Sequence, residues 1–394
     1  MKPRSALAES LPRSGIREVM DLARQMDDVI VLVVGEPSFN TPAHIIDAAA
    51  KAAHAGTTKY TPNSGLPGIK TAVAERYSKK FGRPVTPAEV LVTAGAVNAL
   101  AAIVAAIAEE GDEILIPDPG WPNYVSMIGL ARTVAVRYPL RPEQGYLPDI
   151  AEIEAQITPR TKALVINNPS NPTGAVFPEE TVRELVALAA KHDLWLISDE
   201  IYEDLVFEGE HFPAARFDAE RVITISGVSK SYAMTGWRIG WAITNTELVA
   251  LCGKIQEALV SCPSSVSQAA AEAAVRGPQD AVEEMRVAYQ RRRDLVRELL
   301  EPVGLLPTIP AGAFYAMVDL RGAGIASRDL SRLLLEEEHV AVAPGSTFGD
   351  VAEGMVRISL ATADDDLAEG CRRIIRFAER RGALPVATAA AARV

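Results

Sequence analysis

The chain contains few of the residues that build metal centres and disulfide frameworks. Its 394 residues include three cysteines, Cys252, Cys262 and Cys371, and five histidines. The cysteine spacing fits neither a zinc ligand set nor a disulfide framework. The histidines are scattered and form no His-Glu-x-x-His motif. We therefore expect reduced thiols without catalytic duty and no metal site.

Long apolar runs are also missing. No segment approaches the roughly 18 uncharged apolar residues that a transmembrane helix needs. The first 20 residues carry early basic residues but no apolar core behind them, so they do not form a secretory signal. These two absences predict a cytoplasmic protein.

Phosphate-binding loops of the two best-known kinds are absent as well. The chain contains no Gly-x-x-x-x-Gly-Lys sequence, and no Gly-x-Gly-x-x-Gly follows any expected strand, which disfavours nucleoside triphosphates and dinucleotides as ligands. The net charge of −11 disfavours a nucleic acid or an anionic membrane as partner. It does not decide the substrate, because a few local arginines can still bind an anion.

The chain does contain an alternation of short β-branched runs with amphipathic helical segments, such as Asn98–Glu110 and Pro178–His192. Strand–helix alternation predicts a mainly parallel sheet covered on both faces, and such sheets bind ligands at the carboxyl ends of their strands. Seven strands are expected, at Glu89–Ala94, Glu113–Pro117, Thr133–Tyr138, Lys162–Asn167, Leu194–Asp199, Arg221–Ser226 and Trp237–Thr244.

The pattern changes after Gly277. A long charged helix is expected over Pro278–Glu301, followed by a strand in AFYAMVDL, a helix near Ser327–Glu338, a strand at Met355–Leu360 and a last helix to about Arg381. A chain of this length also exceeds one compact core. We predict a large domain of residues 46–290 and a smaller α+β domain built from residues 1–45 and 291–394, with the long helix bridging the two.

Three residues with anion-binding or nucleophilic chemistry follow one buried strand. Ser229 and Lys230 follow it within four residues, and Arg238 lies eight residues beyond Lys230. Burial would lower the pKa of a lysine there and make its amine a better nucleophile. An arginine with a hydroxyl and backbone N–H groups suits a phosphate. Taken singly, the lysine could equally reach water at a strand end, and the arginine could lie on the surface.

Other strand ends carry weaker signals. Ala94–Ala96 leads from a strand into a helix, where a phosphate could bind. Asp199 ends an apolar strand and needs either a positive partner or a role as helix N-cap, and Tyr202 follows it. Asn171 lies between two prolines in NNPSNPTG, which is a recognition loop or simply a tight turn. Trp121 could stack on a flat ring or belong to the core.

Together these segments resemble one known family. The chain is similar to the class I/II, aspartate-aminotransferase-like enzymes of fold type I, which use pyridoxal 5′-phosphate (PLP). The resemblance runs in family order from about Ser14 to Arg381, nearly the whole chain, and NPSNPTG followed by SK and GWRIG is highly specific. The matching segments are VGEPSFNTP, YTPNSGLPGIKTAVAERY, TAGAVNAL, PGWPNY, NNPSNPTG, SDEIY, SGVSKSYAMTGWRIGW, PAGAFYAMVDL and VRISLA.

The resemblance implies a role for each matching position. Lys230 would hold PLP covalently and act as the catalytic base, Asp199 would pair with the pyridine nitrogen, and Tyr202 and Asn171 would contact the ring hydroxyl. The phosphate would be held by Gly95, Ala96, Val97, Ser229 and Arg238, and Trp121 would stack on the ring. Tyr60 would reach the phosphate of the other subunit, which implies a homodimer with shared active sites. Arg357 would bind the substrate α-carboxylate, with Gly35, Asn171 and Trp121 beside the substrate.

The implied reaction is a ping-pong transfer of an amino group from a neutral, aromatic or aspartate-type L-amino acid to a 2-oxo acid such as 2-oxoglutarate. A PLP-dependent lyase that carries out β-elimination is the alternative on the same fold, and a non-enzymatic PLP-binding regulator is a third. Related aspartate enzymes often carry a lysine or threonine where this chain has Val97, so aspartate is a doubtful donor. The segment SGIREVM offers Ile16 or Arg17 to the site.

Overall fold

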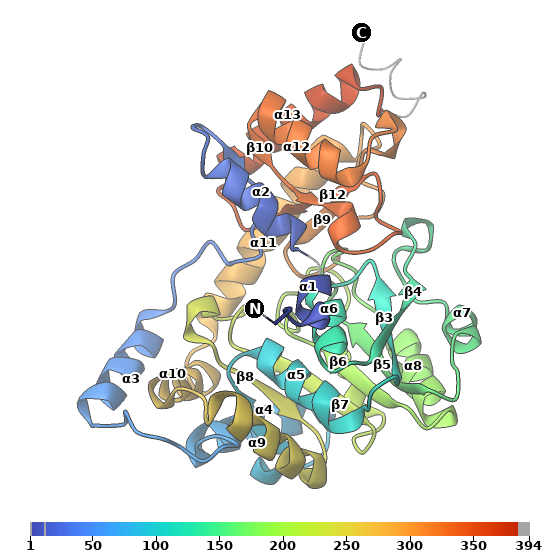
Figure 1. The fold of residues 1–394 in the computed structure, drawn as a ribbon. Coiled ribbons are helices and arrows are strands. Elements are labelled where there is room, and N and C mark those ends of the chain that lie inside the picture. The colour runs from blue at the N-terminus through green and yellow to red at the C-terminus, as the bar shows by residue number, and fades with distance from the viewer. Residues whose placement is uncertain (1, 12, 385–394) are drawn as a thin grey trace.

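A seven-stranded sheet forms the centre of the molecule in the computed structural model, which describes residues 2–11 and 13–384 (Figure 1). The strand order is β2-β8-β7-β6-β5-β3-β4. β8 runs antiparallel to both its neighbours, and the other strands are parallel. The predicted fold class is therefore confirmed. The strands are β2 (Val90–Thr93), β3 (Glu113–Asp118), β4 (Val134–Pro139), β5 (Thr161–Asn167), β6 (Trp195–Asp199), β7 (Val222–Gly227) and β8 (Gly240–Ile243).

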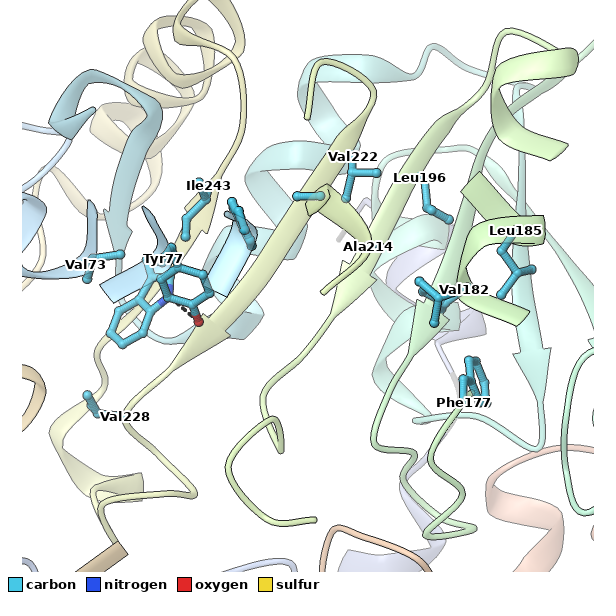
Figure 2. Close-up of a cluster of buried hydrophobic side chains, with 14 of the residues drawn as sticks. Val73, Tyr77, Phe177, Val182, Leu185, Leu196, Ala214, Val222, Val228 and Ile243 are labelled. Carbon is cyan, nitrogen blue, oxygen red and sulfur yellow. Dashed lines mark hydrogen bonds between the residues drawn. The ribbon is translucent and has the colours of Figure 1, made fainter. Parts of the chain in front are cut away.

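Both faces of this sheet are apolar because consecutive strand residues point to opposite sides. Leu196 and Val222 belong to one buried cluster, while their neighbours Ile197 and Ile223 belong to another on the opposite face. Figure 2 shows the first cluster, in which side chains of helices meet the strands. Its helices include α4 (Pro67–Phe81), α8 (Glu179–Lys191) and α10 (Ser265–Arg276), and those of the other cluster are α5 (Ala96–Ile107), α6 (Asn123–Leu130) and α9 (Thr246–Val260).

The antiparallel β8 places its first residues beside the carboxyl end of β7. Residues 228–239 form the connection between the two strands, so both ends of this loop lie at the edge where the parallel strands end. The strand predicted from Trp237 begins instead at Gly240. Arg238 cannot belong to it, because its φ of 54° is left-handed rather than extended.

The C-terminal part forms a separate antiparallel sheet with strand order β11-β12-β9. Its own buried cluster includes Phe314, Val318 and Ile358, together with Leu334 and Ile374 from the helices that cover it. These elements are α11 (Asp280–Leu300), β9 (Tyr315–Asp319), α12 (Ser327–Glu338), β10 (Val340–Ala341), β11 (Ala343–Pro344), β12 (Met355–Ser359) and α13 (Asp364–Arg380). Each predicted C-terminal element is present, with shifted ends except for α12.

The amino-terminal segment contacts both parts of the chain. Its elements are α1 (Ala6–Ser10), α2 (Gly15–Ala23) and β1 (Ile30–Val31), and α3 (Ala43–His54) follows. β1 pairs with β10 and α2 packs on α12, whereas α1 contacts α6 and α3 packs on α10. The division into residues 46–290 and residues 1–45 with 291–394 stays a prediction. Its boundaries fall within α3 and α11, and residues 385–394 lie outside the described residues.

The remaining α-helix, α7 (Ile150–Ala155), precedes β5 and packs on α8. Within the part of the chain that the structure describes, no helix is both long enough and apolar enough to cross a membrane.

Candidate active site

A cavity of about 390 Å³ opens at the carboxyl ends of the central strands. Its wall combines residues of the central sheet with residues of the amino-terminal segment and of the C-terminal sheet. It brings together most of the residues that the sequence singled out, namely Gly35, Ala96, Val97, Trp121, Asn171, Asp199, Tyr202, Ser229, Lys230, Arg238 and Arg357. Gly95 lies directly before Ala96.

Lys230 follows β7 and points its amine into this cavity. Its Nζ donates a hydrogen bond to the carbonyl oxygen of Gly35 at 2.6 Å. Burial, with the nearby guanidinium groups of Arg357 and Arg238, lowers the pKa of the lysine to about 8. An appreciable fraction of the amine is therefore neutral near physiological pH, and a neutral amine can act as a nucleophile or accept a proton.

Asp199 ends β6 as a carboxylate that is only 4% exposed. Its Oδ2 accepts a hydrogen bond from the Tyr124 hydroxyl at 2.6 Å, and its Oδ1 accepts one from the Ile201 N–H at 3.4 Å. Burial raises the pKa of this carboxyl to about 6, so it is mostly ionised at pH 7. Among the described residues no lysine, arginine or histidine lies within 4 Å of it. Asp199 is therefore a buried anion that forms no ion pair with a described residue.

Tyr124 was missed by the sequence analysis. It stands three residues after Trp121 at the start of α6, and the two rings meet edge to face at 5.4 Å. The Tyr124 N–H also donates to the Trp121 carbonyl at 3.1 Å, so the interpretation of Trp121 as a cavity residue could have pointed to its neighbour Tyr124.

Arg357 is the buried cation on the opposite side of the cavity, on β12, and is 2% exposed. Its Nη1 donates to Asn171 Oδ1 at 3.1 Å and its Nη2 to the Val33 carbonyl at 2.7 Å, while Nε has no partner. The guanidinium carbon lies 4.2 Å from the centre of the Tyr315 ring. No carboxylate of the described chain forms an ion pair with it. A buried, unpaired guanidinium is a binding site for an anion.

A second anion site is formed where α5 meets the loop before β8. Gly95 has a φ of 84°, and a Cβ there would lie 2.5 Å from Arg238 Nη2. The arginine therefore reaches the start of the helix only because residue 95 is glycine. α5 begins at Ala96 rather than at the predicted Asn98, so Ala96 and Val97 are in the first turn, whose N–H groups lack partners within the helix. These groups, with Ser229 and Arg238, suit a phosphate.

Two tyrosines complete the floor of the cavity. The hydroxyls of Tyr202 and Tyr315 are 3.0 Å apart and hydrogen-bonded. A Cβ at Gly35 would lie 2.5 Å from the Tyr315 hydroxyl, so this glycine allows the close approach. The sequence predicted the strand of Tyr315, but nothing in it indicated which face of the strand the ring would occupy.

Tyr60 does not reach this cavity. Its side chain is 89% exposed and lies in a shallow groove with Cys262 and Pro263. The question left open for α2 is resolved: Ile16 lines the cavity, whereas Arg17 is exposed.

A separate buried cluster lies outside the cavity. Glu200, Glu203 and His211 place ligand-type atoms within 4.8 Å of one another. The Lys80 ammonium already lies 2.7 Å from Glu203 Oε2, and burial raises the pKa of Glu200 to about 8. Glu200 Oε2 lies 3.6 Å from His211 Nε2. A proton on Glu200 therefore explains why these two side chains can face each other without a bound metal ion.

The chain is similar to known proteins over nearly its full length. The family model for aminotransferase class I and II matches residues 27–374. The aspartate/prephenate aminotransferase of Thermus thermophilus is 40% identical over 96% of this chain and 97% of that protein. The aromatic-amino-acid aminotransferase 2 of Thermococcus litoralis is 38% identical over 93% of this chain and 96% of that protein. The solved structure of Thermus thermophilus aspartate aminotransferase with maleate has a TM-score of 0.91 and 40% identity, covering 95% of this chain and all of that one.

Proposed function

The chain belongs to the class I and II aminotransferase family and is an enzyme that moves amino groups from amino acids to 2-oxo acids, and from this we propose that PLP is its cofactor. One observation carries the proposal. Lys230, Arg238 and Arg357 line one cavity, and none of them forms an ion pair with a described carboxylate. A cofactor with one phosphate and a substrate with one carboxylate would supply the missing anions.

The residues present fit PLP group by group. Arg238, Ser229 and the first turn of α5 would hold its phosphate. Asp199, a buried anion without a cation, would hold the protonated pyridine nitrogen and keep it charged. Tyr202 and Asn171 would contact the ring hydroxyl, and Trp121 would cover the ring.

Arg357 would then bind the α-carboxylate shared by every amino acid and 2-oxo acid. Its carbonyl and amide contacts fix the plane of the guanidinium, which favours a bidentate pair with a carboxylate. Tyr315 packs against the face of the guanidinium and keeps water away from it. This site would orient each donor and acceptor in the same way, so both half-reactions would use one binding mode.

PLP would supply an aldehyde that links to amines and a ring that takes up negative charge. The chain's own contribution is the Lys230 amine, which would carry the cofactor in the resting enzyme and, once released by a substrate amine, accept the proton from the substrate α-carbon. The lowered pKa of Lys230 suits this task, because an amine with a pKa of about 8 is a base near neutral pH.

The direct test is the colour of the purified protein. Protein expressed with PLP should absorb at the boundary between the ultraviolet and the visible. This absorption band should shift when a donor amino acid is added and should return when a 2-oxo acid is added afterwards. Release of the 2-oxo product, measured chromatographically, should match the spectral change. Protein that is colourless and does not bind added PLP would contradict the proposal.

We also propose a homodimer with shared sites. Tyr60 is exposed and lies outside its own cavity, which leaves its hydroxyl available to a second copy. A second subunit bound at this surface would bring Tyr60 to the phosphate of its partner, as the family resemblance implies.

Tyr124→Phe tests how Asp199 is kept ionised. The Tyr124 hydroxyl lowers the pKa of Asp199, so its loss should raise that pKa. A hydrogen bond to a charged group contributes about 1.5–3 kcal/mol, which predicts PLP affinity lower by about tenfold or more at pH 6. At pH 8, where Asp199 is more fully ionised in both proteins than at pH 6, the difference should shrink. Titration of the apoenzyme with PLP at both pH values measures this, and equal losses at both would contradict it.

A further inference from the structure

The charges that line the cavity limit the substrates it can take. Five charged side chains face it, namely Glu36, Asp199, Lys230, Arg238 and Arg357. Under the proposed function, Arg238 binds the phosphate and Arg357 binds the α-carboxylate. Lys230 carries the cofactor, and Asp199 pairs with the ring nitrogen. The remaining charged group is Glu36, which accepts a hydrogen bond from the Thr235 hydroxyl. The described chain therefore offers no free cation for a second carboxylate, and its one uncommitted charge would repel it.

The rest of the wall is apolar where it faces the amino-terminal segment and α5. Ile16, Val34, Val97 and Trp121 supply side chains without a charge. Arg13 and Arg17, the cations nearest in sequence to Ile16, are exposed and do not line the cavity. A side-chain carboxylate placed here would be desolvated without a partner, whereas an apolar side chain would gain from burial.

We infer that the preferred donors are neutral amino acids with apolar side chains, and that aspartate and glutamate are poor donors. This inference rests on the proposed function, because it uses the roles assigned to Lys230, Arg238 and Arg357. Ile16 and Val97 are its specificity-determining residues: they contact the variable part of the substrate.

Leucine and aspartate provide a matched comparison, since an isopropyl group replaces a carboxylate with the same number of heavy atoms. Leucine should exceed aspartate in kcat/KM by about 100-fold or more, because an unpaired charge is costly to bury. Binding of inert carboxylates adds a readout that needs no turnover. By calorimetry on the holoenzyme, 4-methylpentanoate should bind about tenfold or more tightly than succinate, its dicarboxylate counterpart.

Ile16→Lys places a cation on the wall and Ile16→Met is its uncharged control. The lysine variant should raise the aspartate-to-leucine ratio of kcat/KM by about tenfold or more, and the methionine variant should leave it within about threefold. The inference is overturned if wild-type enzyme prefers aspartate, glutamate, lysine or arginine to leucine, or if succinate binds better than 4-methylpentanoate. Failure of every donor and every carboxylate would instead overturn the proposed function, so the two failures are distinguishable.

Discussion

Lys230→Ala should lower kcat by about 1,000-fold or more, since a positioned general acid–base alone contributes about 10²–10⁴-fold. The amine lies inside the cavity, where the Gly35 carbonyl is its one hydrogen-bond partner among the described residues. Burial keeps part of the amine neutral, and no other lysine within residues 2–11 and 13–384 lines the cavity. Steady-state assays at saturating donor and acceptor, with added PLP, measure the loss.

The control is Lys162→Ala. Lys162 is exposed near the amino end of β5, at the opposite end of the sheet from the cavity, and its removal should leave kcat within about twofold of wild type. The Lys230 variant should also release no 2-oxo product on donor addition while keeping its melting temperature within a few degrees. Turnover near the wild-type rate in the Lys230 variant would remove its assigned role.

Arg357→Ala should lower kcat/KM for every donor and every 2-oxo acid by a similar factor. Truncation of one partner of a buried charge pair costs about 2–5 kcal/mol, which corresponds to roughly 30- to 5,000-fold. The uniform factor follows because the α-carboxylate is common to all substrates. Most of the effect should appear in KM, measured separately for leucine, phenylalanine and pyruvate. Arg357→Lys should recover only part of the loss, since an ammonium cannot make a bidentate pair.

Arg292→Ala separates this effect from a general cost of losing a buried arginine. Arg292 is also buried, but it pairs with Asp364 at 2.8 Å and does not line the cavity. Its loss should lower the melting temperature and leave KM nearly unchanged. An unchanged KM in the Arg357 variant would place the carboxylate site elsewhere.

The sheet was predictable because each strand is a short apolar run bounded by turn or helix signals. Leu194–Asp199 and Arg221–Ser226, for instance, were expected as strands and correspond to β6 and β7 within a residue or two. The predicted strand and helix boundaries are wrong where the local backbone conformation determines them. Arg238 reads as part of a strand, but its left-handed φ places it in the loop before Gly240. The predicted start of α5 at Asn98 is two residues too late, because the small residues Ala96 and Val97 carry no strong helix-start signal.

The cavity residues were predicted from motifs rather than from periodicity. Motif order placed Lys230, Asp199 and Arg357 in one site, and the structure brings their side chains to one cavity. Tyr124 and Tyr315 were not found, because the first must turn toward Asp199 and the second toward the cavity, and no local pattern indicates which faces of α6 and β9 do so. The direction of Ile16 and Arg17 depends on how α2 packs against the C-terminal elements, and contacts across more than 300 residues are invisible in a local pattern.

The hydrogen bond between Arg357 and the Val33 carbonyl joins residues 324 positions apart, and it bears on the order in which a ribosome completes the site. Gly35, Asp199, Lys230 and Arg238 all emerge well before Arg357. A growing chain could therefore assemble the proposed cofactor cradle while the carboxylate site still lacks its guanidinium. A chain that ended between β8 and β12 would carry every residue of the proposed cofactor cradle but would lack the guanidinium that orients a substrate.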